Sequence, residues 1–114
     1  MLMMNRPILV ALAAIFTISV FCTWQNNAIT TTQIDYISPK IPEEFNGYRI
    51  VHISDLHNKQ FGKNQERLLK RIRAVSPDII VITGDLIDRR KYDLETAMLF
   101  INGAIKIAPL YYVS

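Results

Sequence analysis

The alternation of apolar and polar residues predicts a parallel α/β unit in most of this chain. Leu68, Leu69, Ile72 and Val75 recur at helical spacing with basic residues opposite, which is typical of an amphipathic helix. Residues 79–83 form a continuous β-branched run, the pattern of a strand buried on both faces of a parallel sheet. The whole pattern predicts strand, helix, strand, helix, strand, over residues 48–54, 64–75, 79–83, 94–107 and 110–113.

A further strand is predicted ahead of this unit. Residues 33–38 (QIDYIS) alternate polar and apolar side chains, which is typical of a half-exposed strand. Pro39 and Pro42 then interrupt the chain, and Asn46-Gly47 is a turn signal. We therefore expect residues 33–38 to pair with the strand at 48–54 in a hairpin or a nearly antiparallel arrangement.

The N-terminal apolar segment predicts a membrane helix. Residues 8–24 are apolar apart from three hydroxyl side chains, and a helix of this length measures about 25 Å, which is short for a bilayer span. A cleaved signal peptide and a buried core helix are the alternatives; bulky Phe21 and Trp24 argue against a cleavage site, so an uncleaved anchor is favoured. The expected organisation is an anchor at 1–24, a polar linker at 25–32, and a domain at 33–114.

The distribution of charged residues predicts the orientation of the apolar segment in the membrane and the kinds of partner that the domain can bind. Arg6 precedes the apolar segment and the next basic residue is Lys40, so the domain is expected on the extracytoplasmic side of the membrane. The net charge is +3, and ten of the thirteen basic residues lie within residues 49–91. The basic helix at 64–75 could attract anionic headgroups or phosphorylated substrates, but a solvated face is the simpler interpretation. Without aromatic interleaving or a binding motif, no nucleic-acid partner is expected.

Candidate ligands follow two of the predicted strands directly. Asp55 and His57 come after the strand at 48–54, and Gly84-Asp85 comes after the strand at 79–83. Carboxyl ends of parallel strands meet at one edge of a sheet, so Asp55, His57 and Asp85 are expected to share a crevice. Facing carboxylates repel one another unless a cation binds between them, and this donor set suits Mn, Fe or Zn. His52, inside its strand, is expected to be a hydrogen-bonded core histidine.

The spacing D-x-H followed by G-D-x-x-D resembles the first two motifs of the calcineurin-like metallophosphoesterases. The stretch IVHISDLHN is similar to membrane-associated bacterial members with an N-terminal anchor, and the resemblance covers residues 34–114. It implies the first part of a four-layer α/β sandwich with a two-metal site. In that pattern Asp55 and His57 bind the first metal, Asp85 bridges both metals, and a hydroxide held between them attacks phosphorus. Asp88 would support a catalytic histidine and Arg89 would contact phosphate.

The later motifs of that family are absent from this sequence. The two histidines are His52 and His57, and no G-N-H block occurs. The chain is therefore expected to be the N-terminal part of a phosphoesterase domain and inactive by itself. A non-catalytic fragment or an interaction module that keeps part of the fold is the alternative. The expected partners are the membrane and a phosphorylated substrate, for which the anchor favours a lipid or envelope component.

Overall fold

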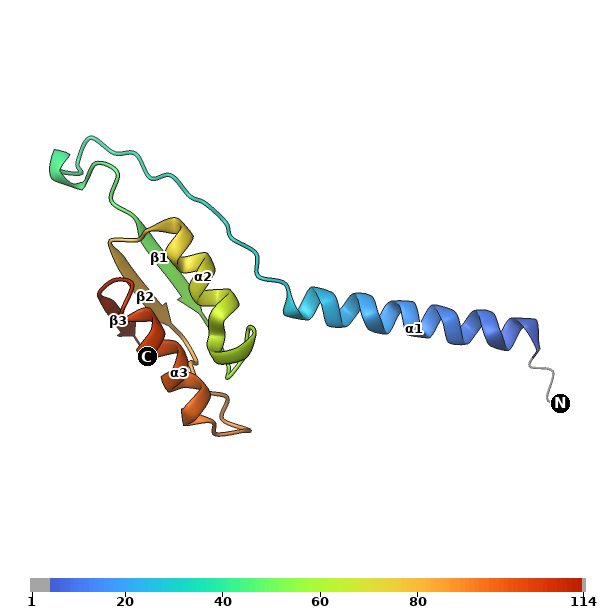
Figure 1. Cartoon of the computed structure of the whole chain (residues 1–114). Helices are drawn as coiled ribbons and strands as arrows, with labels where there is room; N and C mark the ends of the chain where they lie inside the picture. Colours follow the sequence, from blue (N-terminus) through green and yellow to red (C-terminus); the bar gives the residue numbers. More distant parts are fainter. Residues whose placement is uncertain (1–4, 114) are drawn as a thin grey trace. The chain divides into compact units, whose positions relative to one another are not determined.

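The computed structural model describes residues 5–113 and divides the chain into two compact units, residues 1–34 and 35–114. The first unit contains helix α1 (Arg6–Asn27), and the second contains all the strands (Figure 1). Each unit is described by itself.

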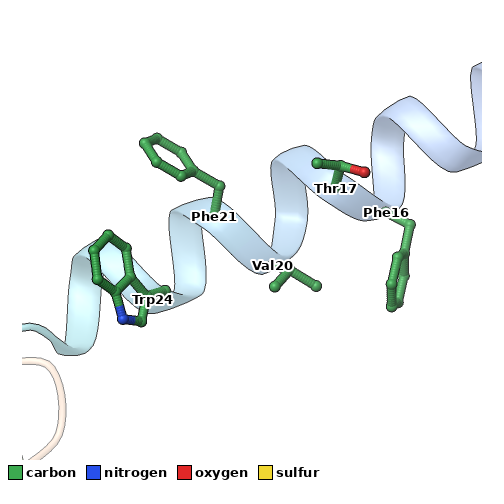
Figure 2. Close-up of a pocket in the computed structure, with 5 residues that line it drawn as sticks. All are labelled: Phe16, Thr17, Val20, Phe21 and Trp24. Carbon is green, nitrogen blue, oxygen red and sulfur yellow. The ribbon is translucent and has the colours of Figure 1, made fainter.

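Helix α1 is long and apolar enough to cross a membrane. Its 22 residues correspond to about 33 Å, which matches the roughly 30 Å of a bilayer core. The prediction of about 25 Å was too short, because the helix begins at Arg6 and residues 25–27 of the expected linker are helical. Phe16, Val20 and Trp24 project from α1 and are exposed (Figure 2). The first four residues of the expected anchor lie outside the described residues.

The second unit is a three-stranded parallel sheet in the order β1-β2-β3. Ile50 pairs with Ile79 at one end of β1, and Ser54 pairs with Thr83 at the other, with no shift in register. The predicted series of three strands and two helices is confirmed. Its elements are η1 (Glu43–Phe45), β1 (Ile50–Ser54), η2 (Lys63–Gln65), α2 (Glu66–Val75), β2 (Ile79–Thr83), α3 (Leu94–Ala104) and β3 (Leu110–Val113).

Helices α2 and α3 cover one face of the sheet (Figure 1). Ile80 and Ile82 of β2 are fully buried on this side of the sheet, and Phe100 of α3 is also fully buried. On the other face, Ile79 and Val81 are only partly buried, and Tyr111 is exposed. The prediction that residues 79–83 are buried on both faces was therefore wrong for the residues described. The β-branched run reflects the apolar character of both faces, but the helices cover only one of them.

The strand predicted at residues 33–38 does not form. Ile34, Tyr36 and Ile37 have side chains exposed by 84%, 78% and 93%, and the segment is irregular. Alternating residues form a strand only when a neighbouring strand accepts their backbone hydrogen bonds. In the described structure β1 pairs with β2, so the expected hairpin with residues 33–38 is also wrong.

Asp93 caps the N-terminus of α3 and makes this helix sensitive to acid. Its carboxylate accepts hydrogen bonds from the backbone N–H of Thr96 at 3.0 Å and from the Thr96 hydroxyl at 2.7 Å. The backbone bond and then the hydroxyl bond hold the pKa of Asp93 below its ordinary value of 3.8, against a smaller opposing effect of burial. Folding lowers the pKa of Asp93, so the cap stabilises α3 fully at pH values above 3.8, the ordinary pKa. This stabilisation is lost as the pH falls through the lowered pKa of the folded protein.

We therefore expect the amide signal of Thr96 to titrate, and α3 to lose protection from hydrogen exchange, as the pH falls from about 5 to 2. The matched variant Asp93→Asn keeps a capping side chain without a titrating group, so its α3 should show no such acid step. An unchanged acid step in Asp93→Asn would assign the effect to another carboxyl group.

Candidate metal centre

The loops that carry the two acidic motifs remain paired beyond the ends of β1 and β2. The backbone N–H of Asp55 donates to the carbonyl of Thr83 at 3.1 Å, and that of His57 donates to the carbonyl of Asp85 at 3.0 Å. The N–H of Asn58 continues the series to the carbonyl of Leu86 at 3.2 Å. Buried Leu56 and Leu86 fix the two loops to the core. The motifs are therefore held side by side by backbone contacts.

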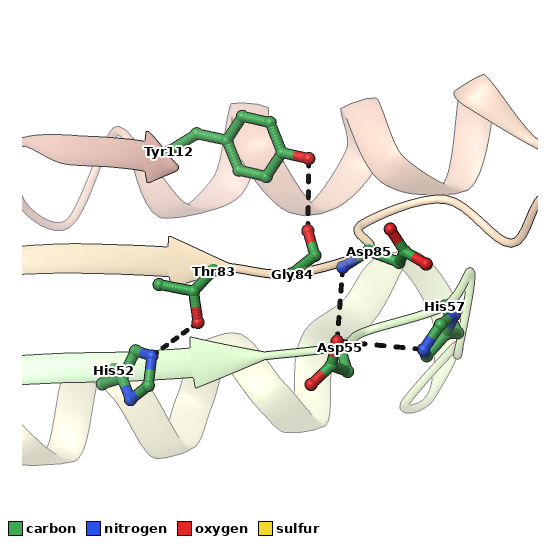
Figure 3. Close-up of polar contacts among 7 residues, drawn as sticks. All are labelled: His52, Asp55, His57, Thr83, Gly84, Asp85 and Tyr112. Atoms are coloured by element: carbon green, nitrogen blue, oxygen red, sulfur yellow. Dashed lines mark hydrogen bonds and ion pairs between the residues drawn. The ribbon is translucent and has the colours of Figure 1, made fainter. Parts of the chain in front are cut away.

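This pairing brings Asp55 and His57 together at the carboxyl end of the sheet (Figure 3). The Nε2 atom of His57 lies 4.0 Å from Oδ1 of Asp55, and their side chains are 48% and 60% exposed. Metal–ligand distances of about 2.1 Å allow two ligands of one ion to lie up to about 4.2 Å apart. One carboxylate oxygen and one imidazole nitrogen are thus within the span of a single divalent cation and are open to solvent.

Asp85 joins this group through its backbone. Its N–H donates to Oδ1 of Asp55 at 3.3 Å, so the same Asp55 oxygen faces both Asp85 and His57 (Figure 3). Within the described part of the chain, no three His, Cys, Asp or Glu side chains form a group that could hold a metal ion. The role of the Asp85 carboxylate as a third ligand therefore stays a prediction.

Gly84 provides the space in which the Asp55 carboxylate lies. A Cβ atom added at position 84 would lie 2.2 Å from Oδ1 and 2.9 Å from Cγ of Asp55, which is closer than Cβ atoms approach such neighbours in real structures. The backbone of Gly84 also has a φ of +74°, a conformation that residues other than glycine rarely adopt. Glycine is thus favoured by the turn, and it lets the Asp55 carboxylate keep its observed place. The space at Gly84 and the donor atoms, a carboxylate oxygen and an imidazole nitrogen, are consistent with a site for a divalent cation.

The backbone of the first motif loop is unusual. Asp55, His57 and Asn58 all have positive φ, at 50°, 46° and 57°. Non-glycine residues adopt this left-handed conformation at a cost of about 1–2 kcal/mol each, and they keep it only where the surrounding structure fixes it. The hydrogen bonds to the second loop supply part of that constraint.

Asp88 and Arg89 lie in the turn that follows the second motif. A carboxylate oxygen of Asp88 accepts a hydrogen bond from the backbone N–H of Arg90 at 2.8 Å, and the carbonyl of Asp88 accepts one from Lys91 at 3.2 Å. Asp88 is partly buried, whereas Arg89 is exposed. The observed contacts of Asp88 stabilise a turn. Its predicted support of a catalytic histidine, and the predicted contact of Arg89 with phosphate, stay predictions.

His52 is hydrogen-bonded but does not lie in the core. Its Nε2 atom lies 2.8 Å from Oγ1 of Thr83 on the neighbouring strand (Figure 3). The side chain is exposed, since it projects from the face of the sheet that α2 and α3 leave open. The prediction of a core histidine was right about the hydrogen bond and wrong about burial.

Asn58 and Tyr112 contribute to the site region and were not assigned there from the sequence. The Asn58 side-chain amide donates to the carbonyl of Lys91, and its Oδ1 atom is buried without a hydrogen-bond partner among the described residues. The hydroxyl of Tyr112 donates to the carbonyl of Gly84 at 3.2 Å (Figure 3). An asparagine directly after the D-x-H block is a usable signal, because asparagine tolerates the left-handed conformation. Tyr112 carries no comparable signal, since tyrosine is ordinary in strands.

The parallel sheet and the two paired motif loops at its edge define an α/β protein with a candidate metal centre. Residues 48–114 match the family profile described as calcineurin-like phosphoesterase. The chain belongs to this family, which generally uses divalent metal ions and has phosphoesterase-type function.

Curated relatives agree with this assignment. The chain is 31% identical over 96 residues to an uncharacterized metallophosphoesterase of Campylobacter jejuni, a match that covers 78% of this chain and 25% of that protein. It is 36% identical to the UDP-2,3-diacylglucosamine pyrophosphatase LpxG of Chlamydia muridarum, in a match that covers 61% of this chain and 23% of that protein. It is also 37% identical to a transmembrane protein with metallophosphoesterase domain of Danio rerio, in a match that covers 51% of this chain and 14% of that protein.

The matches to these relatives span a quarter of their length or less. No solved structure matches the chain significantly.

Proposed function

We propose that this chain supplies the first metal ligands of a metal-dependent phosphoesterase, with Asp55 and His57 holding one divalent cation and Asp85 reaching toward a second. The observation that carries the proposal is the 4.0 Å separation of Asp55 Oδ1 and His57 Nε2, at the edge where the two loops pair. Bound Mn, Fe or Zn would neutralise charge on phosphoryl oxygens and generate the attacking hydroxide.

Several of the chain's own residues prepare this site. Gly84 leaves room for the Asp55 carboxylate, and the N–H of Asp85 orients it. The exposure of Asp55 and His57 leaves both side chains open to a ligand from solvent. Arg89, exposed after the second motif, is available to attract an anionic substrate, and Asp88 fixes the turn that carries it. The proposed roles of Asp88 and Arg89 rest on the family pattern.

Zinc binding observed at the histidine rings tests the proposal. Zinc is diamagnetic, so its coordination shifts the ring ¹⁵N signal of the ligating histidine without broadening the signals of its neighbours. With the whole chain in detergent micelles, we expect added Zn²⁺ to shift the ring of His57 and to leave that of His52 in place. His52 is a control within the same molecule, because it is exposed on β1, the strand that precedes the His57 loop, yet pairs with Thr83. Equal shifts of both rings, or none, would contradict the proposed site.

The same preparation is expected to show no hydrolysis of a chromogenic phosphodiester with added Mn²⁺. Three candidate ligands, two of them close together in the structure, are too few for two metals and the nucleophile between them. Metal-dependent turnover that disappears in Asp85→Ala would show that these residues suffice.

We further propose that α1 anchors the domain to a bacterial membrane with the domain on the extracytoplasmic side. The support is an apolar helix without acidic residues and with Arg6 at its N-terminal end. A similar protein is named as a transmembrane protein, and another as a pyrophosphatase of a diacylated nucleotide sugar. A phosphorylated lipid or envelope component is therefore the substrate class that we propose.

An alkaline phosphatase reporter fused after Ser114 tests this orientation, because the reporter is active only after export. We expect high reporter activity in bacterial cells, and a green fluorescent reporter at the same position should be dark. Moving the positive charge by Arg6→Gln together with Asn26→Arg and Asn27→Arg should lower export, because positive residues favour the cytoplasmic side. Reporter activity that is low in the unmodified fusion would reverse the proposed orientation.

A further inference from the structure

Gln65 is fully buried although it is polar. Its exposed fraction is 0%, equal to that of the core residues Ile80, Ile82 and Phe100. Buried amide groups are costly unless their hydrogen bonds are satisfied. Its position between two structural elements, at the end of η2 and directly before α2, raises the question of which contacts compensate for burial.

Both ends of the Gln65 side-chain amide bind the backbone of the first motif loop. Its Oε1 atom accepts a hydrogen bond from the N–H of Phe61 at 2.9 Å, and its Nε2 atom donates to the carbonyl of Lys59 at 2.8 Å. The side chain therefore substitutes for a neighbouring strand along residues 59–61. The backbone of Gln65 has a φ of 62°, and this left-handed conformation is a further sign that tertiary contacts fix it.

The loop held by Gln65 begins at the candidate ligand His57. The N–H groups of His57 and Asn58 fix its first part to the second motif loop, and the N–H of Lys59 donates to the carbonyl of Leu56 at 2.8 Å. The left-handed residues Asp55, His57 and Asn58 are thus constrained from one side by the second motif and from the other by Gln65. If either constraint is removed, the loop can relax toward ordinary backbone conformations.

We propose that Gln65 is a positioning residue for the metal centre, acting on His57 through the backbone of residues 59–61. This inference rests on the proposed function, because it assumes that His57 binds the cation. Gln65 does not touch the ligand group. Its amide determines where the imidazole lies by fixing the segment that follows it.

The test compares Gln65→Met with Gln60→Met in the whole chain in detergent micelles. Methionine matches the size of glutamine and removes both hydrogen bonds, and Gln60 is an exposed glutamine of the same loop. Zn²⁺ binding is measured by the shift of the His57 ring signal. We expect Gln65→Met to weaken this binding by about 10- to 100-fold, as loss of a supporting partner does at metal sites. Gln60→Met should bind Zn²⁺ like the unmodified chain.

A second readout needs no metal. Hydrogen exchange at the amides of His57 and Asn58 should accelerate in Gln65→Met, while the amides of Ile80 and Ile82 in the core stay protected. If Gln65→Met loses protection in the core as well, Gln65→Asn decides. It keeps the amide but is one methylene too short to reach both Lys59 and Phe61, so the same loss of Zn²⁺ affinity is expected.

The outcomes separate this inference from the proposed function. Failure of the unmodified chain to show a His57 ring shift with Zn²⁺ would overturn the metal site itself, and the role of Gln65 with it. A shift in the unmodified chain that persists at the same affinity in the folded Gln65 variants would overturn only the positioning role.

Discussion

Gly84→Ala is expected to abolish metal binding at His57 and to destabilise the carboxyl edge of the sheet. The new Cβ would lie 2.2 Å from Oδ1 of Asp55, so the carboxylate must leave its place beside His57 and lose its hydrogen bond from Asp85. The left-handed backbone adds about 1–2 kcal/mol of strain, and displacement of the carboxylate removes the hydrogen bond from the Asp85 N–H. Zn²⁺ titration of the His57 ring and hydrogen exchange at the amides of β2 measure the two effects.

Gly47→Ala is the matched control for this experiment. Gly47 has nearly the same backbone conformation, with a φ of +76° against +74°, but no atom lies within 4 Å of its added Cβ. It therefore reproduces the backbone strain without the collision. If Gly84→Ala and Gly47→Ala had the same effect on Zn²⁺ affinity, the space at Gly84 would have no bearing on the metal centre.

Asp55→Ala is expected to have the second large effect. The substitution removes a proposed ligand and also the oxygen that accepts the N–H of Asp85. We expect the Zn²⁺ affinity measured at His57 to fall by more than the roughly 10- to 100-fold that loss of a supporting partner costs. Asp55→Asn keeps an oxygen for the Asp85 N–H but lacks the charge, so it should restore the loop without restoring the affinity.

Glu44→Ala serves as the control for loss of one carboxylate. Glu44 is exposed in η1, outside the motif loops, and its removal should leave the titration unchanged. Undiminished Zn²⁺ affinity in Asp55→Ala would exclude Asp55 as a ligand. Any loss of Zn²⁺ affinity in Gly84→Ala would then result from displacement of the loop and not from loss of the Asp55 ligand.

The regular elements of the domain were predictable because their signals are local. The boundaries of β2 and β3 agree with the apolar runs at residues 79–83 and 110–113, and α2 and α3 lie within the predicted helices. β2, α2 and α3 bury apolar side chains at the period of their own backbone, so their patterns survive in the sequence, and β3 is a short apolar run. The acidic motifs were predictable for the same reason, since they directly follow two such strands.

The errors occurred where structure depends on a distant partner. Residues 33–38 alternate as a strand does, but they form no strand in the described structure. His52 lies in a β-rich run, yet its face of the sheet is open. A pattern of side chains specifies which face of a segment is apolar, but it does not specify whether another segment covers that face.

Several details of the site follow only from the tertiary structure. The left-handed conformations of Asp55 and His57, and the burial of Gln65, arise from hydrogen bonds between residues far apart in the chain or on opposite sides of a loop. Aspartate and histidine adopt the left-handed conformation more often than most residues, but neither requires it, so the sequence does not determine it.

The sequence by itself determined the α/β class, the family, the apolar N-terminal helix and the two motifs that follow β1 and β2. The tertiary structure decided that Asp55 and His57 lie 4.0 Å apart, that Gly84 makes room for this pair, and that Gln65 fixes the loop beyond it. The physical reason is range. Periodicity and strand-end spacing are properties of neighbouring residues, whereas the position of a ligand depends on hydrogen bonds and close contacts between two loops about thirty residues apart.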